Sequence, residues 1–134
     1  MTHPSMALQA AVVTALLADA GVATLVGDRI YDVPPRAPEF PFVTIGQASV
    51  ADWSTRTEAG AEHRLTLHVW SRERGKKQTY AIMEALEAAL DGAAMTLDGH
   101  ALVNLAFEFA ETRADPDDIT IHGVVRFRAV TEPA

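Results

Sequence analysis

The feature that most constrains this chain is a strict alternation of apolar and polar residues in its second half. Over residues 63–70, the apolar Leu65, Leu67 and Val69 alternate with mostly polar side chains. Because successive side chains of a strand point to opposite faces, this period predicts a strand buried on one face only. Residues 103–109 and 119–130 repeat the pattern. The predicted core-facing residues are Leu65, Leu67, Val69, Val103, Leu105, Phe107, Phe109, Ile119, Ile121, Val125 and Phe127.

An apolar stripe with helical spacing precedes these strands, over about Met6–Ala20. Leu8, Val12 and Leu16 recur every four residues, and most other positions are alanine, a strong helix former. We expect Ser5 to cap the first turn. Gly21 is expected to end the helix in a left-handed conformation.

A second helix is predicted from a cap at Ser71 to about Leu90, followed by Gly92 at the C-cap. Gly75 weakens its first turn, which favours a later start. Its predicted buried face consists of Ile82, Met83, Leu86, Ala89 and Leu90.

The connections between these elements have distinct compositions. Four prolines in Val33–Pro41 predict a stiff extended connector. Phe42–Gly46 is the next predicted strand, and Gln47–Ala61 shows no clean period, so it predicts a long hairpin loop. Gly123, within a strand pattern, predicts a bulge or a close backbone approach.

Taken in order, the elements read helix, strand, strand, helix, strand, strand. This predicts an α+β fold, a two-layer sandwich with a mainly antiparallel four-stranded sheet and two helices on one face. No internal repeat or change of composition divides the chain, so residues 1–134 are expected to form one domain.

Composition limits the possible functions. The 11 basic and 18 acidic residues give a net charge of −7, and no lysine or arginine cluster offers a general phosphate-binding surface. The absence of cysteine excludes disulfides and thiolate metal sites. The N-terminus lacks a secretory pattern and the first apolar segment is too short for a bilayer, so we expect a soluble protein without a membrane partner.

No motif for catalysis or cofactor binding is present. The eight glycines are scattered singly, and no serine lies in a glycine-flanked elbow. His68 and His122 are expected to share the outer sheet face, where Glu108 could complete a metal site. Polar decoration of that face is the favoured interpretation. We therefore expect no catalytic residue, no cofactor and no metal.

The remaining conspicuous residues are typical of an interface. Aromatic residues and arginine are enriched at the centres of protein interfaces. Two apolar residues lie in the predicted 47–61 loop, and the others lie on the outer face of the sheet. The predicted interface residues are Val50, Trp53, Arg64, His68, Trp70, Arg126 and Arg128.

With these segments in place, the chain resembles the tail-completion, or tail-terminator, family of long-tailed phages and gene transfer agents. The strand that ends in Val69-Trp70-Ser71-Arg72 before a helix is the most characteristic stretch. The resemblance spans nearly the whole chain and rests on Ala7–Ala11, Gly27–Pro35, Phe40–Gly46, Leu65–Arg72 and His122–Ala129.

The resemblance implies a structural virion protein rather than an enzyme. It implies a subunit, assembled in the bacterial cytoplasm, of a hexameric ring at the head-proximal end of the tail. Such a ring stops the tail tube protein from polymerising, joins a head–tail connector protein, and lets DNA pass through its lumen as non-specific cargo. Two alternatives stay open: a head-side connector, such as a stopper or adaptor, and a small α+β ligand-binding module or hydrolase.

Overall fold

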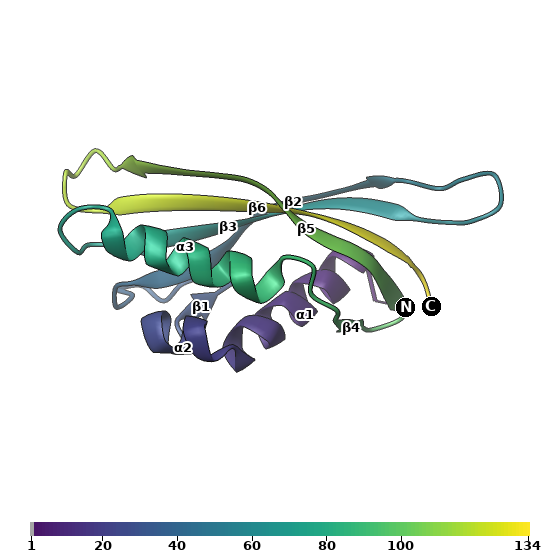
Figure 1. The fold of residues 1–134 in the computed structure, drawn as a ribbon, viewed down its shortest axis with the longest axis horizontal. Coiled ribbons are helices and arrows are strands. Elements are labelled where there is room, and N and C mark those ends of the chain that lie inside the picture. Colours follow the sequence, from purple (N-terminus) through teal and green to yellow (C-terminus); the bar gives the residue numbers. More distant parts are fainter. Residues whose placement is uncertain (1) are drawn as a thin grey trace.

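A computed structural model describes residues 2–134 and shows a curled sheet with all helices on its concave side (Figure 1). The fold is α+β. In chain order the elements are α1 (Pro4–Ala18), α2 (Ala20–Val26), β1 (Ile30–Tyr31), β2 (Phe42–Asp52), β3 (Ala61–Ser71), α3 (Lys77–Leu90), β4 (Thr96–Leu97), β5 (His100–Ala114) and β6 (Ile121–Pro133).

The predicted four-stranded antiparallel sheet with two helices is wrong. The sheet has six strands in the order β1-β2-β3-β6-β5-β4, and it is mixed because β1 pairs with β2 in parallel. The two additional strands are two-residue edge strands, too short to show any period.

The third helix arises because the first predicted helix is interrupted at Asp19. Its side chain accepts a hydrogen bond from the Val22 amide at 3.0 Å and caps α2. The expected terminator, Gly21, therefore lies in the first turn of α2. No single helix of residues 2–134 is long and apolar enough to cross a bilayer; only α1 and α2 together reach that length, with an 81° bend between them.

The caps also differ from those predicted. His3, rather than Ser5, caps α1 by accepting a hydrogen bond from the Ser5 amide. Ser71 is the last residue of β3, and α3 begins six residues later at Lys77. Gly92 follows α3 with a positive φ of 72°, as expected for a glycine that ends a helix.

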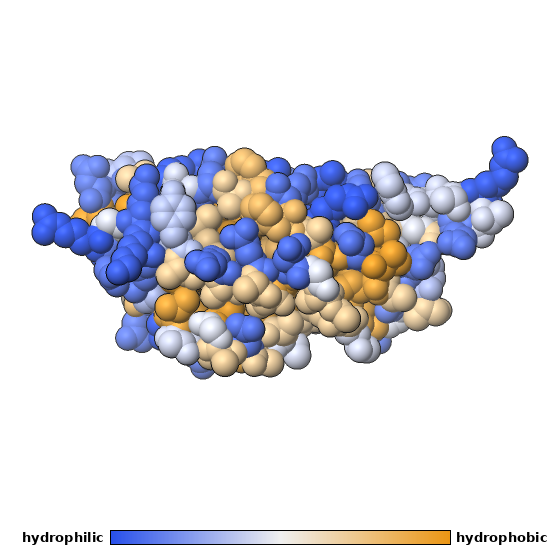
Figure 2. Space-filling view, in the orientation of Figure 1, coloured by the Kyte–Doolittle hydropathy of each residue, from blue (hydrophilic) through white to orange (hydrophobic). Residues whose placement is uncertain are grey.

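The core lies between the inner face of the sheet and the three helices. Inward residues of β3 and β6 pack against the apolar stripes of α1 and α3. Figure 2 shows the molecule in the same orientation as Figure 1, with hydrophobic residues gathered over its middle and hydrophilic ones at the two projecting ends. The fully buried members of the core include Val12, Leu16, Leu67, Ile82, Leu86, Val125 and Phe127.

The strands reach well beyond the predicted boundaries. β2 continues to Asp52 after a register shift between Ile45 and Ala48, and it pairs with β3 throughout. The connection between the two strands of this hairpin is therefore residues 53–60, shorter than the expected 47–61. The two long hairpins, β2–β3 and β5–β6, project at opposite ends of the molecule (Figure 1).

Gly123 marks the closest approach of α3 to the sheet. A β-carbon at this position would lie 2.8 Å from Met83 Sδ and 2.9 Å from Thr79 Cγ2. The β3–β6 register runs through Gly123 without a shift, so the close approach, rather than the bulge, is the correct interpretation.

We predict that Gly123→Ala lowers the free energy of unfolding by about 1–3 kcal/mol, because the added methyl overpacks the α3 contact. Urea unfolding of the purified chain measures this change. In a Met83→Ala background the same substitution should lower the free energy of unfolding by clearly less, because the shortened side chain leaves room for the added methyl group. Equal costs in both backgrounds would contradict the contact as the cause.

Candidate functional site

The outer face of the sheet, the side without helices, gathers most of the residues predicted to form an interface. Alternation along β3 and β6 places Arg64, His68, Trp70, Arg126 and Arg128 together on this face. Trp53 joins them from the hairpin tip, because the Arg128 guanidinium lies 5.2 Å from its ring centroid. Val50 does not: it pairs with the buried His63, so its side chain points to the helix side.

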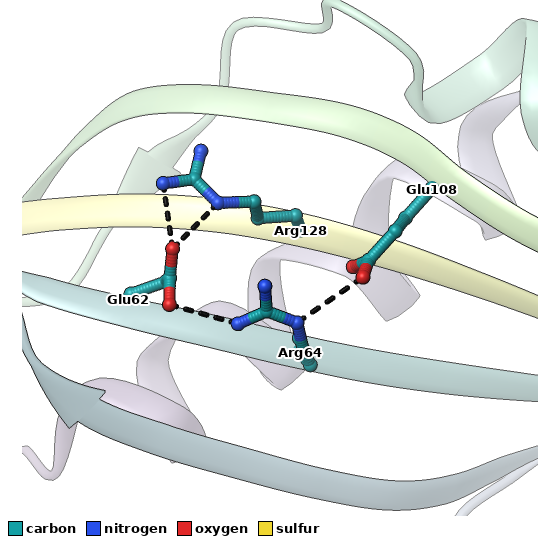
Figure 3. Close-up of polar contacts among 4 residues, drawn as sticks. All are labelled: Glu62, Arg64, Glu108 and Arg128. Atoms are coloured by element: carbon teal, nitrogen blue, oxygen red, sulfur yellow. Dashed lines mark hydrogen bonds and ion pairs between the residues drawn. The ribbon is translucent and has the colours of Figure 1, made fainter.

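Four charged residues form an ion network on this face (Figure 3). Glu62 bridges two arginines, with Oε1 2.8 Å from Arg64 Nη1 and Oε2 2.6 Å from both Arg128 Nε and Arg128 Nη2. Arg64 Nε also donates to Glu108 Oε1 at 3.2 Å. The hydrogen bonds from Arg64 and then Arg128 hold the pKa of Glu62 below its ordinary value. These contacts fix the orientation of the arginines within the subunit.

A β-bulge supplies a second arginine contact. The register of β5 against β6 shifts between Phe107 and Phe109, which turns Phe109 to the outer face beside Arg126. The Arg126 guanidinium lies 4.8 Å from the Phe109 ring centroid, within cation–π range. Phe107 stays on the helix side, with its ring 6.4 Å from that of Phe127.

A stack of aromatic rings covers the other half of the outer face. The rings of Trp70 and His122 lie 4.0 Å apart and nearly parallel, and His68 lies 4.8 Å from His122. Phe42 extends the stack at 6.2 Å from Trp70. The Trp70 indole N–H donates to Thr44 Oγ1 at 3.0 Å, so its polar atom is satisfied.

Burial disfavours protonation of the paired imidazoles. His68 Nδ1 lies 2.6 Å from His122 Nε2, a hydrogen bond that needs one donor and one acceptor nitrogen. Burial lowers the pKa of both rings, and Arg113 lowers both further by charge repulsion. Asp115 and Glu111 act weakly in the opposite direction on the pKa of His122.

His68, His122 and Glu108 do not come together as a metal site. Glu108 is engaged by Arg64 and belongs to the ion network, whereas the histidines belong to the ring stack. Within residues 2–134 no group of three or more His, Cys, Asp or Glu side chains could hold a metal ion.

A hollow away from the outer face offers little chemistry. It has a volume of about 460 Å³ and lies between α1 and the β4 region. Its lining is largely alanine, threonine and methionine, and Asp98 is its one titratable side chain. This hollow therefore lacks the several neighbouring titratable groups that a hydrolase site would need. The arrangement on the outer face is instead that of a surface built for packing and charge pairing.

Sequence reasoning missed three residues of this face. Glu62, the centre of the ion network, lay at the edge of the unpatterned segment. Thr44 carries no distinctive signal in the sequence. Phe109 was assigned to the core face by alternation, and only the bulge places it outside. For Glu62 a signal existed: it lies two residues before Arg64, on the same face of the strand.

Comparisons with known proteins agree on the class to which this fold and surface belong. Residues 10–132 match the family described as "Tail completion protein gp17". The tail completion protein gp17 of Bacillus phage SPP1 is 25% identical over 104 residues, which cover 75% of each chain. A chain from the virion of a native gene transfer agent particle superposes with a TM-score of 0.90 at 36% identity, covering 98% of this chain and 99% of that one.

The molecule is therefore a structural protein of phage-type tails. It belongs to the tail completion protein gp17 family, which matches nearly its whole length. This confirms the resemblance drawn from the sequence and the expected location in a phage or gene-transfer-agent particle.

We predict that the stability of the fold decreases as the pH falls below about 6.5. The unfolded chain takes up protons on its histidines near that pH, whereas burial lowers the pKa of His63, His68 and His122 in the fold, so these three resist protonation there. Each such histidine contributes a slope of at most about 1.4 kcal/mol per pH unit. Urea unfolding between pH 5 and 8 measures it.

His68→Gln should reduce this slope, and His3→Gln, at an exposed position, serves as the matched control. A stability independent of pH, or equal slopes in the two variants, would show that the stacked pair is not the source.

Proposed function

We propose that this protein is a tail terminator: a ring-forming subunit that caps the tail tube and provides the surface to which the head joins. The observation that carries the proposal is the match over residues 10–132 to a tail completion family, together with near-complete superposition on a chain of a gene transfer agent virion. Ring closure follows when head-to-tail contacts between identical subunits have a rotation that closes.

The proposed partners follow from this position. The subunit contacts its own copies, in a ring of six, and it contacts the tail tube protein on one side and a head–tail connector protein on the other. DNA passes through the lumen as non-specific cargo. A net charge of −7 supports a conduit role, because an acidic lumen would repel phosphates rather than retain them.

The seven residues predicted to form an interface are divided by the structure into two sets. Five lie on the outer sheet face, where the ion network, the ring stack and the contact of Arg126 with Phe109 hold them in place. Val50 and Trp53 belong to the projecting β2–β3 hairpin, with 38% and 53% of their surfaces exposed. A projecting hairpin with an exposed indole is a feature that a monomer does not need.

The decisive test is the length of tails made without this subunit. Tube proteins should still polymerise, because growth starts at the opposite end, but nothing should stop it. We therefore predict separate DNA-filled heads together with tails of irregular and often excessive length. Electron micrographs of a deletion lysate, with tail lengths measured against wild type, provide the measurement.

A head-side connector, either a stopper or an adaptor, predicts a different outcome. Tails would then keep the narrow wild-type length distribution, and heads would leak DNA or fail to join. Unattached tails of normal length would overturn the terminator proposal in favour of this role.

We further predict that Trp53→Ala weakens ring assembly by about 2 kcal/mol or more, because a buried aromatic anchor typically contributes that much to an interface. Stability of the isolated subunit should change little, since the side chain is half exposed there. Light scattering as a function of concentration measures assembly. Ile119→Ala, at an equally exposed position on the opposite hairpin, is the matched control, and equal effects would argue against an anchor at Trp53.

A further inference from the structure

Two strand edges of the sheet are open, one on each side. β1 covers β2 only at Val43 and Thr44, and β4 covers β5 only at His100 and Ala101. The end of α3 covers the next part of β5, where the Gly92 amide donates to Leu105 O at 2.7 Å and Asp91 accepts from the Phe107 amide. In the described residues, this leaves 46–52 of β2 and 108–114 of β5 unpaired on their outer sides. Open edges are templates for pairing with another strand.

The alternation of hydrogen bonds shows which backbone groups these edges present. The Trp53 amide bonds Gly60 O, so residues 51 and 49 face β3, and residues 48, 50 and 52 present their N–H and C=O groups outward. The Asp115 amide donates to Thr120 O. By the same rule, the backbone N–H and C=O groups of residues 110, 112 and 114 point away from β6, towards the open edge. Each edge thus offers three residues.

The two edges also match in strand direction and in the face of the sheet to which their side chains point. Each neighbouring pair from β2 through β3 and β6 to β5 is antiparallel, so β2 and β5 run in opposite directions. Val50 pairs with the buried His63 and Thr112 pairs with Gly123, which places both side chains on the helix side. One copy can therefore extend the sheet of the next with all helices on the same face.

We propose that the open β2 edge of one copy pairs antiparallel with the open β5 edge of the next, so that the sheets of the ring are continuous. Val50 then lies opposite Thr112 of the next copy, with Ala48 opposite Ala114 and Asp52 opposite Ala110. This inference rests on the proposed ring and names the contact that builds it. It uses two different edges of each subunit, so the contact is head-to-tail; such a contact builds a ring when its rotation closes, and it cannot build an isolated two-fold dimer.

A groove beside the β5 edge supports this register. It has a volume of about 360 Å³ between α3 and β5 and is lined by Tyr80, Met83, Glu84, Glu87, Ala110, Glu111 and Thr112. Val50, on the helix side of an added strand, would enter it. Tyr80 borders the entrance, where its hydroxyl hydrogen-bonds Thr112 Oγ1 at 3.0 Å.

Charge complementarity favours a second copy as the occupant. The β2–β3 hairpin tip carries Arg56, which is exposed and makes no ion pair within residues 2–134. In the proposed register the tip extends past Ala110 towards the end of α3, where acidic side chains gather. Burial and the charges of Asp91 and Glu84 raise the pKa of Glu87, as expected for an acidic cluster without a cation. Arg56 of the next copy would supply that cation.

Disulfide trapping tests the pairing directly, because the chain has no cysteine of its own. Hydrogen-bonded antiparallel pairs have Cα atoms about 5.5 Å apart, within disulfide range. Val50→Cys/Thr112→Cys should give a covalent ladder up to the full ring after mild oxidation of purified particles. Val50→Cys/Val103→Cys is the matched control: Val103 is exposed on the same strand but roughly 30 Å from the contact. We expect at least tenfold less ladder from it.

The possible outcomes separate this inference from the proposed function. Ring-sized mass by light scattering or in particles, with no ladder from Val50→Cys/Thr112→Cys, would overturn the edge pairing and leave the ring standing. Equal ladders from both double variants, or dimers from Val50→Cys alone, would also overturn it. A single copy per particle would overturn both the proposed ring and the proposed edge pairing.

A proline pair provides a second measurement without crosslinking. Val50→Pro removes an outward N–H that the isolated subunit does not use, so the subunit should keep its Tm while ring assembly falls at least tenfold. Ala51→Pro removes an N–H that faces β3, and it should lower the Tm of the subunit itself. Wild-type assembly by a folded Val50→Pro variant would overturn the proposal.

Discussion

The pairing of β3 with β6 is the interaction on which the rest of the structure depends. Eleven residue pairs join these central strands in unbroken register, from Ala61 opposite Thr131 to Ser71 opposite Ile121. Because the period of a strand is two, this one register decides which side chains enter the core and which form the outer face. A slip by one residue would bury arginines and expose Phe127. The ion network and the ring stack exist only because this ladder holds.

The predictable part of the fold corresponds to this ladder. Alternation over 63–70 and in the last strand was clear in the sequence, and it correctly separated Leu65, Leu67, Val125 and Phe127 from the outer residues. Where a strand contains a bulge, the period is interrupted and the prediction fails. The shift after Ile45 hid the second half of β2. In β5, one shift left Val103 exposed at a bulge, and the other turned Phe109 to the outer face.

The candidate site was predictable to the same extent. Five of its arginine and aromatic residues follow from the period of two strands, which neighbour each other in the sheet. Their partners do not follow from it, because Glu108 contacts Arg64 across two strand pairings and a bulge. A possible short strand at Arg29–Tyr31 could be read from the sequence and corresponds to β1, whereas the two-residue β4 and the helix break created by one capping residue, Asp19, carry too little pattern to be predicted.

The two surfaces of the subunit differ in how much of their interaction capacity is already used. On the outer face, Glu62 engages both Arg64 and Arg128, and Arg126 lies against Phe109, so few charges are left to attract a partner. The strand edges are the reverse, since their backbone groups have no partner within residues 2–134. Net charge opposes association of free copies, because each carries −7. Edge pairing on its own is then weak, and it gains strength where another assembly, such as a tube end, already holds the copies side by side. A subunit of this design would therefore form rings at a lower concentration on a tail end than in free solution.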